Sequence, residues 1–536
     1  LMIPDLPPLK VLESQTLSGS ATSVRLPASG TISATGNRHI VVLVNGRTDR
    51  ALMNDDVRFQ YNGDTGSNYA TQGLYGTGGT PVAWNVSGQT RTYGISISGA
   101  NAPANASGGG ALVIPHAFGD TFKTSLGYGG AHEGISVATT NYWASTDAIT
   151  YITATPDVGD NFLTGSVFTL CVVDEAYLVE EDILTEPQAG FNFTSLPTPD
   201  YGSLSLIANL RAAGSYGDNN TLITFNGDET TTNYRLQRLL GLGSSIAASS
   251  GNQSNSAAHP GATATANTFS GLVASVNQYD LPADDPSMHV LNGHQDGSVL
   301  WIGANRWNNP TEITSVKLIS NGGDSYVAGS MLSVYSTPKI LLNRQVVAGA
   351  AASSITFTLS GYTIPDSVEH LRVHVYAQKN ASSSADIYVE FNSDTTAANY
   401  DYSRMYGVST TASGDSSAAL ARFLGMPGTD IAEKFGGGTA LIANYANTTF
   451  HKHWTFIDGN GGEYVVAGSG RWENTAAIAT IKLTPQAGSF SIGSVFELEG
   501  IGNLGWSGTV MGVANPGKVM GVEKANIGKV MGVESA

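Results

Sequence analysis

A short motif that occurs three times constrains the fold of this chain more than any other feature. Each copy has an aromatic residue, then Asn-Gly-Asp or Asn-Ser-Asp, then Asn-Tyr, within 61–69, 225–234 and 391–400. The first asparagines of the copies are 164 and 166 residues apart, and two further markers keep nearly the same spacing. These markers are the tryptophans Trp143, Trp307 and Trp472 and the pairs Gly165-Ser166, Gly329-Ser330 and Gly493-Ser494. Solenoid repeats are about 20–50 residues long, so the period predicts three tandem domains, each with its own core.

The composition favours strands over helices in each copy. Charged residues make up 13% of the 536 residues, whereas 41% are hydrophobic and 64 are glycine. Helical proteins normally carry Glu and Lys on exposed faces, whereas short strands are joined by turns rich in Gly, Ser and Asn. Segment 234–240 has helical residues, but its counterpart at 69–75 contains a glycine, so both are predicted as strands. We therefore predict an all-β protein with three antiparallel, jelly-roll-like sandwiches of roughly eight strands each.

Proline-rich and acidic segments divide the chain between the copies. Residues 1–10 are predicted as an extended N-terminal arm because they are proline-rich. The repeats are assigned to 11–175, 189–337 and 338–500, with an acidic linker at 176–188 and a tail at 501–536. The Ser-, Ala- and Gly-rich stretches 244–268 and 408–418 are predicted as loops, where the copies differ most.

Charge and apolar patterning exclude several classes of function. The net charge of −17 disfavours binding to nucleic acid or to an anionic membrane surface. No run of 18 apolar residues predicts a membrane span, and the single Cys171 is expected to be a small buried residue. The opening residues lack the basic and apolar regions of a signal peptide, so release by host lysis is the expected route out of a cell.

The repeated Asn-Gly or Asn-Ser dipeptide predicts a tight hairpin turn. Asn-Gly is favoured where both central residues of a turn need positive φ. The alternative is a calcium site that uses Asp64, Asp228 and Asp394 as ligands. A calcium loop usually offers more carboxylates at alternate positions, which favours the turn.

The repeated tryptophans Trp143, Trp307 and Trp472 are predicted to anchor the three cores, because an indole buries a large apolar area. A stacking platform for sugars is the alternative, since an amphipathic ring suits both roles.

No catalytic motif is present, and we predict neither an enzyme nor a cofactor. The chain has no Gly-x-Ser-x-Gly elbow, phosphate-binding loop or His-Glu-x-x-His sequence. His451 and His453, with Glu463 nearby, suggest a metal site, but only the third copy has them, and we expect these histidines to face solvent. A polysaccharide depolymerase would need a carboxylate pair in a groove, and the sequence identifies none.

The tail repeats Val-Met-Gly-Val three times. Short strand-forming units of this kind can add to the sheet edge of another subunit, and we predict that assembly role for six valines. They are Val510, Val513, Val519, Val522, Val530 and Val533.

Several of these segments resemble a module of tailed-bacteriophage virion structural proteins. The resemblance rests on the Asn-Gly-Asp…Asn-Tyr motif, on 445–449, 471–478 and 490–496 of the third copy, and on the tail, which is similar to VxGV-xx-AxI-x-K repeats. It implies a virion protein of the tail or fibre, with a capsid-decorating protein as the alternative. The expected partners are other virion proteins and further copies of the chain, with a trimer favoured because three copies per chain mimic three subunits. A carbohydrate-binding adhesin, which would contact host-surface glycans, is the rival of a different class.

Overall fold

A computed structural model describes most of the chain. The described residues are 6–34, 38–131, 135–197, 203–252, 255–277, 285–294, 298–337, 340–362, 364, 368–428, 435–459 and 464–502, with the tail pairs 509–510, 513–514, 518–519 and 522–523. In this part of the chain the helices are four 3-10 turns, η1 (Glu175–Tyr177), η2 (Thr231–Asn233), η3 (Leu359–Gly361) and η4 (Ala397–Asn399). No described helix has the length and apolar character needed to cross a bilayer.

Each of the three domains pairs an eight-stranded large sheet with a four-stranded small sheet. In domain 1 the large sheet has the order β1 (Leu9–Thr16), β12 (Val167–Val173), β3 (Ile40–Gly46), β8 (Gly108–Ile114), β9 (Lys123–Ala131), β10 (Ile135–Trp143), β5 (Tyr69–Gly76), β6 (Val82–Gln89). Its small sheet has the order β2 (Val24–Leu26), β11 (Ile152–Pro156), β4 (Asn54–Tyr61), β7 (Thr92–Ser98).

Domains 2 and 3 repeat this strand order. The large sheet of domain 2 is β13 (Leu178–Ile183), β24 (Met331–Thr337), β15 (Ser203–Leu210), β20 (Ser270–Asn277), β21 (Ser287–His294), β22 (Val299–Trp307), β17 (Tyr234–Leu242), β18 (Ser245–Gly251), and its small sheet is β14 (Gly190–Phe193), β23 (Val316–Ser320), β16 (Asp218–Phe225), β19 (Asn255–Pro260). The large sheet of domain 3 is β25 (Ile340–Val346), β36 (Val495–Gly502), β27 (Val368–Ala377), β32 (Gly436–Ala443), β33 (Lys452–Gly459), β34 (Tyr464–Trp472), β29 (Tyr400–Val408), β30 (Thr411–Ser417), and its small sheet is β26 (Ile355–Thr358), β35 (Thr480–Pro485), β28 (Ala385–Phe391), β31 (Arg422–Met426).

The strand order is that of a jelly roll with two added hairpins. In domain 1, β1-β12-β3-β8 and β2-β11-β4-β7 give the two interleaved four-stranded sheets of a jelly roll. The hairpins β9–β10 and β5–β6 then extend the large sheet. The predicted all-β fold of three antiparallel sandwiches is confirmed, with twelve strands per domain where we expected about eight.

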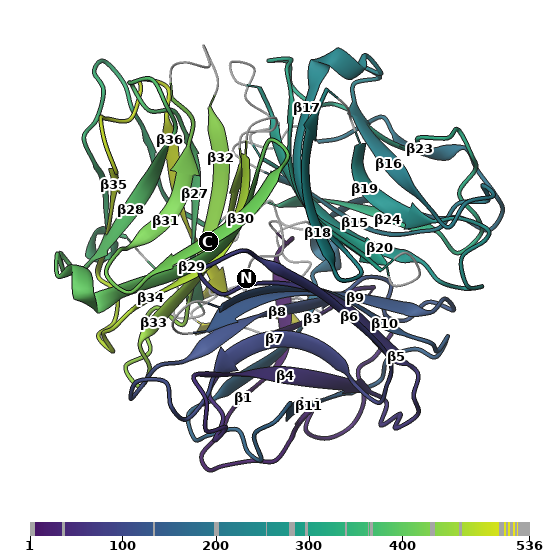
Figure 1. Cartoon of the computed structure of the whole chain (residues 1–536), viewed down its shortest axis with the longest axis horizontal. Coiled ribbons are helices and arrows are strands. Elements are labelled where there is room, and N and C mark those ends of the chain that lie inside the picture. Colours follow the sequence, from purple (N-terminus) through teal and green to yellow (C-terminus); the bar gives the residue numbers. More distant parts are fainter. Residues whose placement is uncertain are drawn as a thin grey trace.

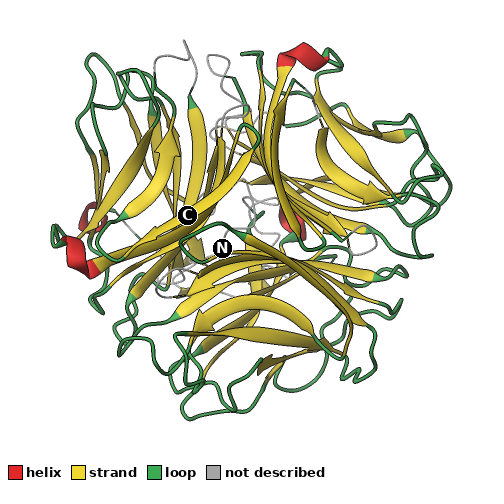
Figure 2. Cartoon of the chain, in the orientation of Figure 1, coloured by secondary structure: helices red, strands yellow, loops and turns green. Residues whose placement is uncertain are grey.

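The added hairpins bring the three domains together around a shared centre (Figure 1), and each lobe is built mainly of strands, with loops at its periphery (Figure 2). Contacts between domains join β9 to β34, β10 to β21 and β17 to β29. Domains 1 and 2 have their own apolar clusters, and Cys171 is buried, as predicted. The core of domain 3 is continuous with a layer of buried residues from both other domains, such as Leu126 and Ile302. The three domains therefore share apolar burial as one block.

Glycines at equivalent positions allow the large sheets to approach closely at each boundary. A Cβ at Gly130 would lie 2.2 Å from Ser469 Oγ of domain 3, and one at Gly459 would lie 2.2 Å from Ala304 Cβ of domain 2. A Cβ at Gly293 would lie 2.7 Å from Thr140 Cβ of domain 1. The small partner residue always stands three positions before the repeated tryptophan. Each contact joins a different pair of domains, so the three domains close into a ring.

A set of hydrogen bonds follows the same cycle. Gln72 Nε2 donates to Gly243 O at 3.0 Å, and Gln237 Nε2 donates to Ser409 O at 3.1 Å. Ser403 occupies the same position in domain 3, and its hydroxyl donates to Gly76 O at 3.4 Å. The order is domain 1 to 2, 2 to 3 and 3 to 1, which is the head-to-tail arrangement of a cyclic trimer within one chain.

Two of the predicted boundaries differ in the structure. The segment 176–188, predicted as a linker, contains β13, which pairs with β24 as the first strand of domain 2. Its acidic residues lie on an edge strand, where Glu181 contacts Arg38 Nε of domain 1 at 3.1 Å. Leu9 and Lys10, predicted as part of the arm 1–10, belong to β1.

The stretches predicted as loops, 244–268 and 408–418, contain β18, β19 and β30, so these loop predictions are wrong. By contrast, 234–240 lies in β17, which confirms the predicted strand.

The described part of the tail forms two short antiparallel pairs, β37 (Thr509–Val510) with β38 (Val513–Ala514) and β39 (Lys518–Val519) with β40 (Val522–Glu523). Val510 pairs with Val513 and Val519 with Val522, so the valines of one repeat pair with each other. Val530 and Val533 lie outside the described residues.

The glycine contacts predict a sharp response to a single methyl group. Gly459→Ala should lower the free energy of unfolding by about 1–3 kcal/mol, because the added Cβ overpacks against Ala304. Urea denaturation measures the change. Ala304→Gly in the same chain should restore part of the loss, and Gly361→Ala is the control, since nothing lies within 4 Å of a Cβ there. Equal stability of the Gly459 variant and the native chain would contradict the contact.

Candidate functional site

The repeated motif forms the same tight turn in all three domains. Asn62 and Gly63 have φ of 51° and 69°, Asn226 and Gly227 have the same values, and Asn392 and Ser393 have 52° and 60°. Positive φ at both central residues confirms the predicted tight turn, which Asp64 N closes by donating to Tyr61 O. The predicted hairpin is wrong, because the strands before and after the turn, such as β4 and β5, lie in different sheets.

The turn asparagine connects this turn to the segment that leads into the neighbouring strand of the small sheet. Asn62 Oδ1 accepts a hydrogen bond from Thr150 N at 2.8 Å, and its Nδ2 donates to Ala148 O at 2.8 Å. Asn226 and Asn392 make the corresponding bonds in domains 2 and 3. The asparagine is therefore repeated for its side chain as well as for its tolerance of positive φ.

The turn aspartate accepts a hydrogen bond from the repeated tryptophan of its own domain. Trp143 Nε1 donates to Asp64 Oδ2 at 2.7 Å, Trp307 Nε1 to Asp228 Oδ2 at 2.9 Å, and Trp472 Nε1 to Asp394 Oδ2 at 2.8 Å. The asparagine of the Asn-Tyr pair donates to the same Oδ2 in every domain. A backbone N–H two residues after the aspartate donates to its Oδ1. Both oxygens of the three calcium candidates thus have donors from the protein.

These donors stabilise the ionised aspartate. Burial acts to raise the pKa of Asp394, but hydrogen bonds from Trp472, Asn399 and Thr396 outweigh it and lower that pKa to about 2. The pKa values of Asp64 and Asp228 are lowered in the same way. A carboxylate that accepts several hydrogen bonds holds its charge without a metal ion.

The repeated tryptophans are core residues. Trp143 is 2% exposed, and Trp307 and Trp472 are 1% exposed. Their rings contact the aromatic residues of the motif, such as Tyr69 and Tyr234. No face of these indoles is open for a sugar, so the stacking alternative does not apply to them.

The expectation that His451 and His453 face solvent is wrong. They are 9% and 3% exposed. His453 lies in β33, an inner strand of the large sheet, and His451 directly precedes that strand. A ring nitrogen of His451 lies 3.1 Å from Arg471, and burial lowers the pKa of His453 to about 4. Glu463 lies outside the described residues. Within the described part of the chain, no group of three or more His, Cys, Asp or Glu side chains is placed to hold a metal ion.

A charged ring in domain 3 is the most distinctive polar cluster outside the repeated motif. Arg404 contacts Asp415 at 2.6 Å and Asp386 at 3.0 Å, and Arg422 contacts the same two aspartates at 3.0 and 2.8 Å. Each guanidinium thus touches both carboxylates, and the ring has no net charge. Arg404 also lies 5.1 Å from the ring centroid of Tyr406, within cation–π range.

Asp458 lies behind this ring as a buried carboxyl group. It pairs with Val466, which pairs with Tyr406, so these three side chains point to the same face of the large sheet. Asp458 is 1% exposed, and no described side chain donates a hydrogen bond to it. Burial raises its pKa to about 8, against smaller opposite effects of Arg404 and the Gly425 backbone. Most of the Asp458 carboxyl is therefore protonated at pH 7.

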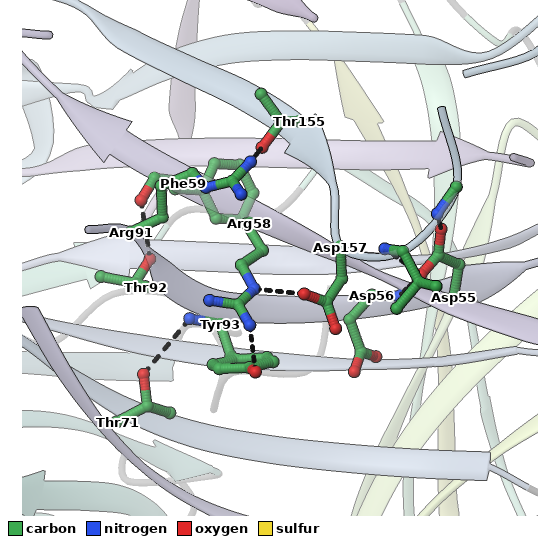
Figure 3. Close-up of polar contacts among 12 residues, drawn as sticks. Asp55, Asp56, Arg58, Phe59, Thr71, Arg91, Thr92, Tyr93, Thr155 and Asp157 are labelled. Atoms are coloured by element: carbon green, nitrogen blue, oxygen red, sulfur yellow. Dashed lines mark hydrogen bonds and ion pairs between the residues drawn. The ribbon is translucent and has the colours of Figure 1, made fainter. Parts of the chain in front are cut away.

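Domain 1 has a related cluster with a different arrangement (Figure 3). Arg58 Nε contacts Asp157 Oδ1 at 2.5 Å, and its guanidinium lies 3.5 Å from the ring centroid of Tyr93. Asp56 corresponds to Asp386, since each stands five residues before the aromatic residue of the motif. Ser96 donates to Asp56, and burial raises the pKa of Asp56 to about 6. Neither cluster is predicted by the repeated motif, because both contain residues that differ between the copies.

Comparisons with known proteins do not place the chain in a family. No protein-family model and no curated protein matches it. Among solved structures, domains LG4-5 of the mouse laminin alpha1 chain align over 63% of this chain and 94% of theirs, with 10% identity and a TM-score of 0.15. A bacterial polysaccharide outer membrane secretin aligns over 78% of this chain and 99% of its own, with 8% identity and a TM-score of 0.10. Scores this low carry no argument about function.

The Asp–Trp bond predicts a coupled change in stability and ionisation. Trp472→Phe should lower the free energy of unfolding by about 1–3 kcal/mol and raise the pKa of Asp394 towards its ordinary value, because the carboxylate loses an N–H donor. Carboxyl-carbon NMR of aspartate-labelled protein measures the pKa. Trp454→Phe is the matched control, since Trp454 Nε1 faces Arg422 O instead. An unchanged Asp394 pKa in the Trp472 variant would refute the assignment.

Burial of the Asp458 carboxyl predicts that Asp458→Asn raises the free energy of unfolding by an amount that depends on pH. An unfolded aspartate titrates near 4, so between about pH 4 and 8 the folded chain binds one more proton and loses stability as pH rises. Asparagine does not titrate, so the variant does not lose this stability. The difference in free energy of unfolding between the variant and the native chain should increase by on the order of a few kcal/mol from pH 5 to pH 9. Urea denaturation at the two pH values tests it, with exposed Asp218→Asn as control. The same difference at pH 5 and pH 9 would count against a neutral Asp458.

Proposed function

We propose that this protein is a structural component of a bacteriophage virion, built into or projecting from the tail. The observation that carries the proposal is the closure of three jelly-roll-like domains into one block through repeated contacts. The residues repeated in all three domains serve turns and cores, and jelly rolls are common in viral capsid proteins. A capsid-decorating position is the alternative within this class.

The block offers open edges for assembly. β1, β13 and β25 each end a large sheet with one described neighbour. We propose that tail valines, beginning with Val510 and Val513, pair with such an edge on a neighbouring subunit. One chain already supplies three domains around one centre, so the proposed homotrimer is an association of three such blocks.

Electron microscopy of the purified phage particle tests the assignment. Density for three sandwiches around a common centre should occur on the tail. Particles that assemble fully in a host unable to make this chain, with no change in composition, would overturn the virion role.

The adhesin alternative gains support from one observation, a hollow in domain 3 lined by charged and aromatic side chains. An adhesin that binds a sugar on the repeated tryptophan of each domain gains no support, because these tryptophans are buried.

The assembly role proposed for the tail predicts that its removal prevents oligomer formation but leaves folding unchanged. A chain that ends at residue 502 keeps all 36 strands of the sandwiches and should melt close to the native temperature. Its oligomers should fall to single chains in light scattering, because the strands proposed to add to neighbouring edges are gone. An unchanged oligomer size would contradict the role of the tail.

A further inference from the structure

A hollow of about 490 Å³ opens between the two sheets of domain 3. Asp386 and Gly425 of the small sheet form one side, and Arg404, Tyr406 and Tyr464 of the large sheet form the other. These strands lie in the green lobe of Figure 1. The volume is within the range of about 300–1,000 Å³ that is typical of small-molecule sites.

One cross-strand position beside the hollow differs between the three domains. The fourth residue after the repeated tyrosine is Gly73, Arg238 or Arg404 in domains 1 to 3, and its partners on the outer strand are Trp84, Ser249 and Asp415. In domain 1 the indole of Trp84 lies over Gly73, where a Cβ would be 2.4 Å from the ring. The Trp84 and Tyr93 rings form a T-shaped pair with 4.8 Å between their centroids. In domain 2, Arg238 stacks on Trp301 at 4.2 Å. In domain 3, Arg404 lines the hollow and forms an ion pair with Asp415.

The two charged side chains of the lining, Arg404 and Asp386, belong to the charged ring, which has no net charge. Arg404 and Arg422 share Asp386 and Asp415, so each cation is already neutralised. An anionic ligand would compete with two carboxylates, and a cationic ligand with two guanidinium groups. Ser384 and Gln486 add a hydroxyl and an amide at the rim. Such an arrangement suits a ligand with many hydroxyl groups and no charge.

The same hollow offers apolar surface beside these polar groups. Tyr406, Val408 and Val466 line it, and Val408 is 44% exposed. A pyranose ring has this mixed character, since its hydroxyls lie at the edge and its C–H groups form faces that pack on an aromatic ring.

We propose that this hollow in domain 3 is a binding site for a neutral saccharide. The ring of Tyr406 packs on a face of the sugar. Asp386 and Gln486 accept hydrogen bonds from its hydroxyls, and Arg404 donates to them while it remains paired with Asp415. The site is independent of the proposed place on the virion, because it uses residues of one domain within one chain.

A transplant of the domain 1 arrangement tests the proposal. Arg404→Gly with Asp415→Trp recreates the Gly73–Trp84 pair and should fill the hollow, while the Arg422–Asp386 ion pair remains. The labelled full-length chain is applied to an array of neutral, sialylated and uronic-acid glycans, and the best neutral glycan is then titrated in a calorimeter. The native chain should bind neutral glycans with one site per chain, and the filled variant should bind at least about tenfold more weakly.

Two further variants distinguish loss of the binding site from loss of the fold. Tyr406→Ala removes the stacking ring and should weaken binding at least about tenfold, whereas Ser249→Ala, at the equivalent position of domain 2, should change it less than about twofold. The melting temperature of each variant is measured in parallel. Absence of binding to every neutral glycan, a preference for acidic glycans, or equal binding by the native chain and the two hollow variants would overturn the proposal.

Discussion

Close approach of neighbouring sheets is the constraint on which the rest of this structure depends. At each boundary a glycine without Cβ faces a small side chain of the next domain, as Gly130 faces Ser469. The sheets then share one buried apolar layer, into which Leu126 and Ile302 pack. Burial of this layer favours the closed ring, and the glycines set the distance at which it closes. The side-chain hydrogen bonds that follow the same cycle fix the order of the domains.

The three copies have kept their framework and changed their surfaces. The turn, the Asp–Trp bond and the boundary glycine occur in every domain, and each serves the fold. By contrast, Gly73, Arg238 and Arg404 occupy one position with three different surroundings. The side chain at this position points to the opposite face of the sheet from that of the residue directly before it, whose hydrogen bond crosses the domain boundary. A change here therefore leaves the bonds of the ring in place. Domain 3 can therefore differ in binding while the block keeps its shape.

The sequence predicted the fold class, the three copies, the turn and the buried tryptophans, because each depends on local residue type or on the repeat spacing. It did not connect Asp394 to Trp472, since these residues are 78 positions apart and only the fold brings them together. The strands β18 and β30 were missed because edge strands near solvent can consist of small polar residues such as those at 411–417. The boundary glycines Gly130, Gly293 and Gly459 recur at nearly the same spacing as the motif, so a search of the repeats for small residues would have found them. The charged ring of domain 3 differs in residues and in arrangement from the related cluster of domain 1, so no repeat marks it.

Differential scanning calorimetry of the intact chain tests most directly whether the three domains form one unit. If the shared apolar layer holds them together, unfolding of one exposes the boundary faces of the other two, and all three unfold in a single transition. The ratio of calorimetric to van't Hoff enthalpy should then be about one. A ratio near three, or three separate transitions, would show that the domains unfold independently and would contradict the account.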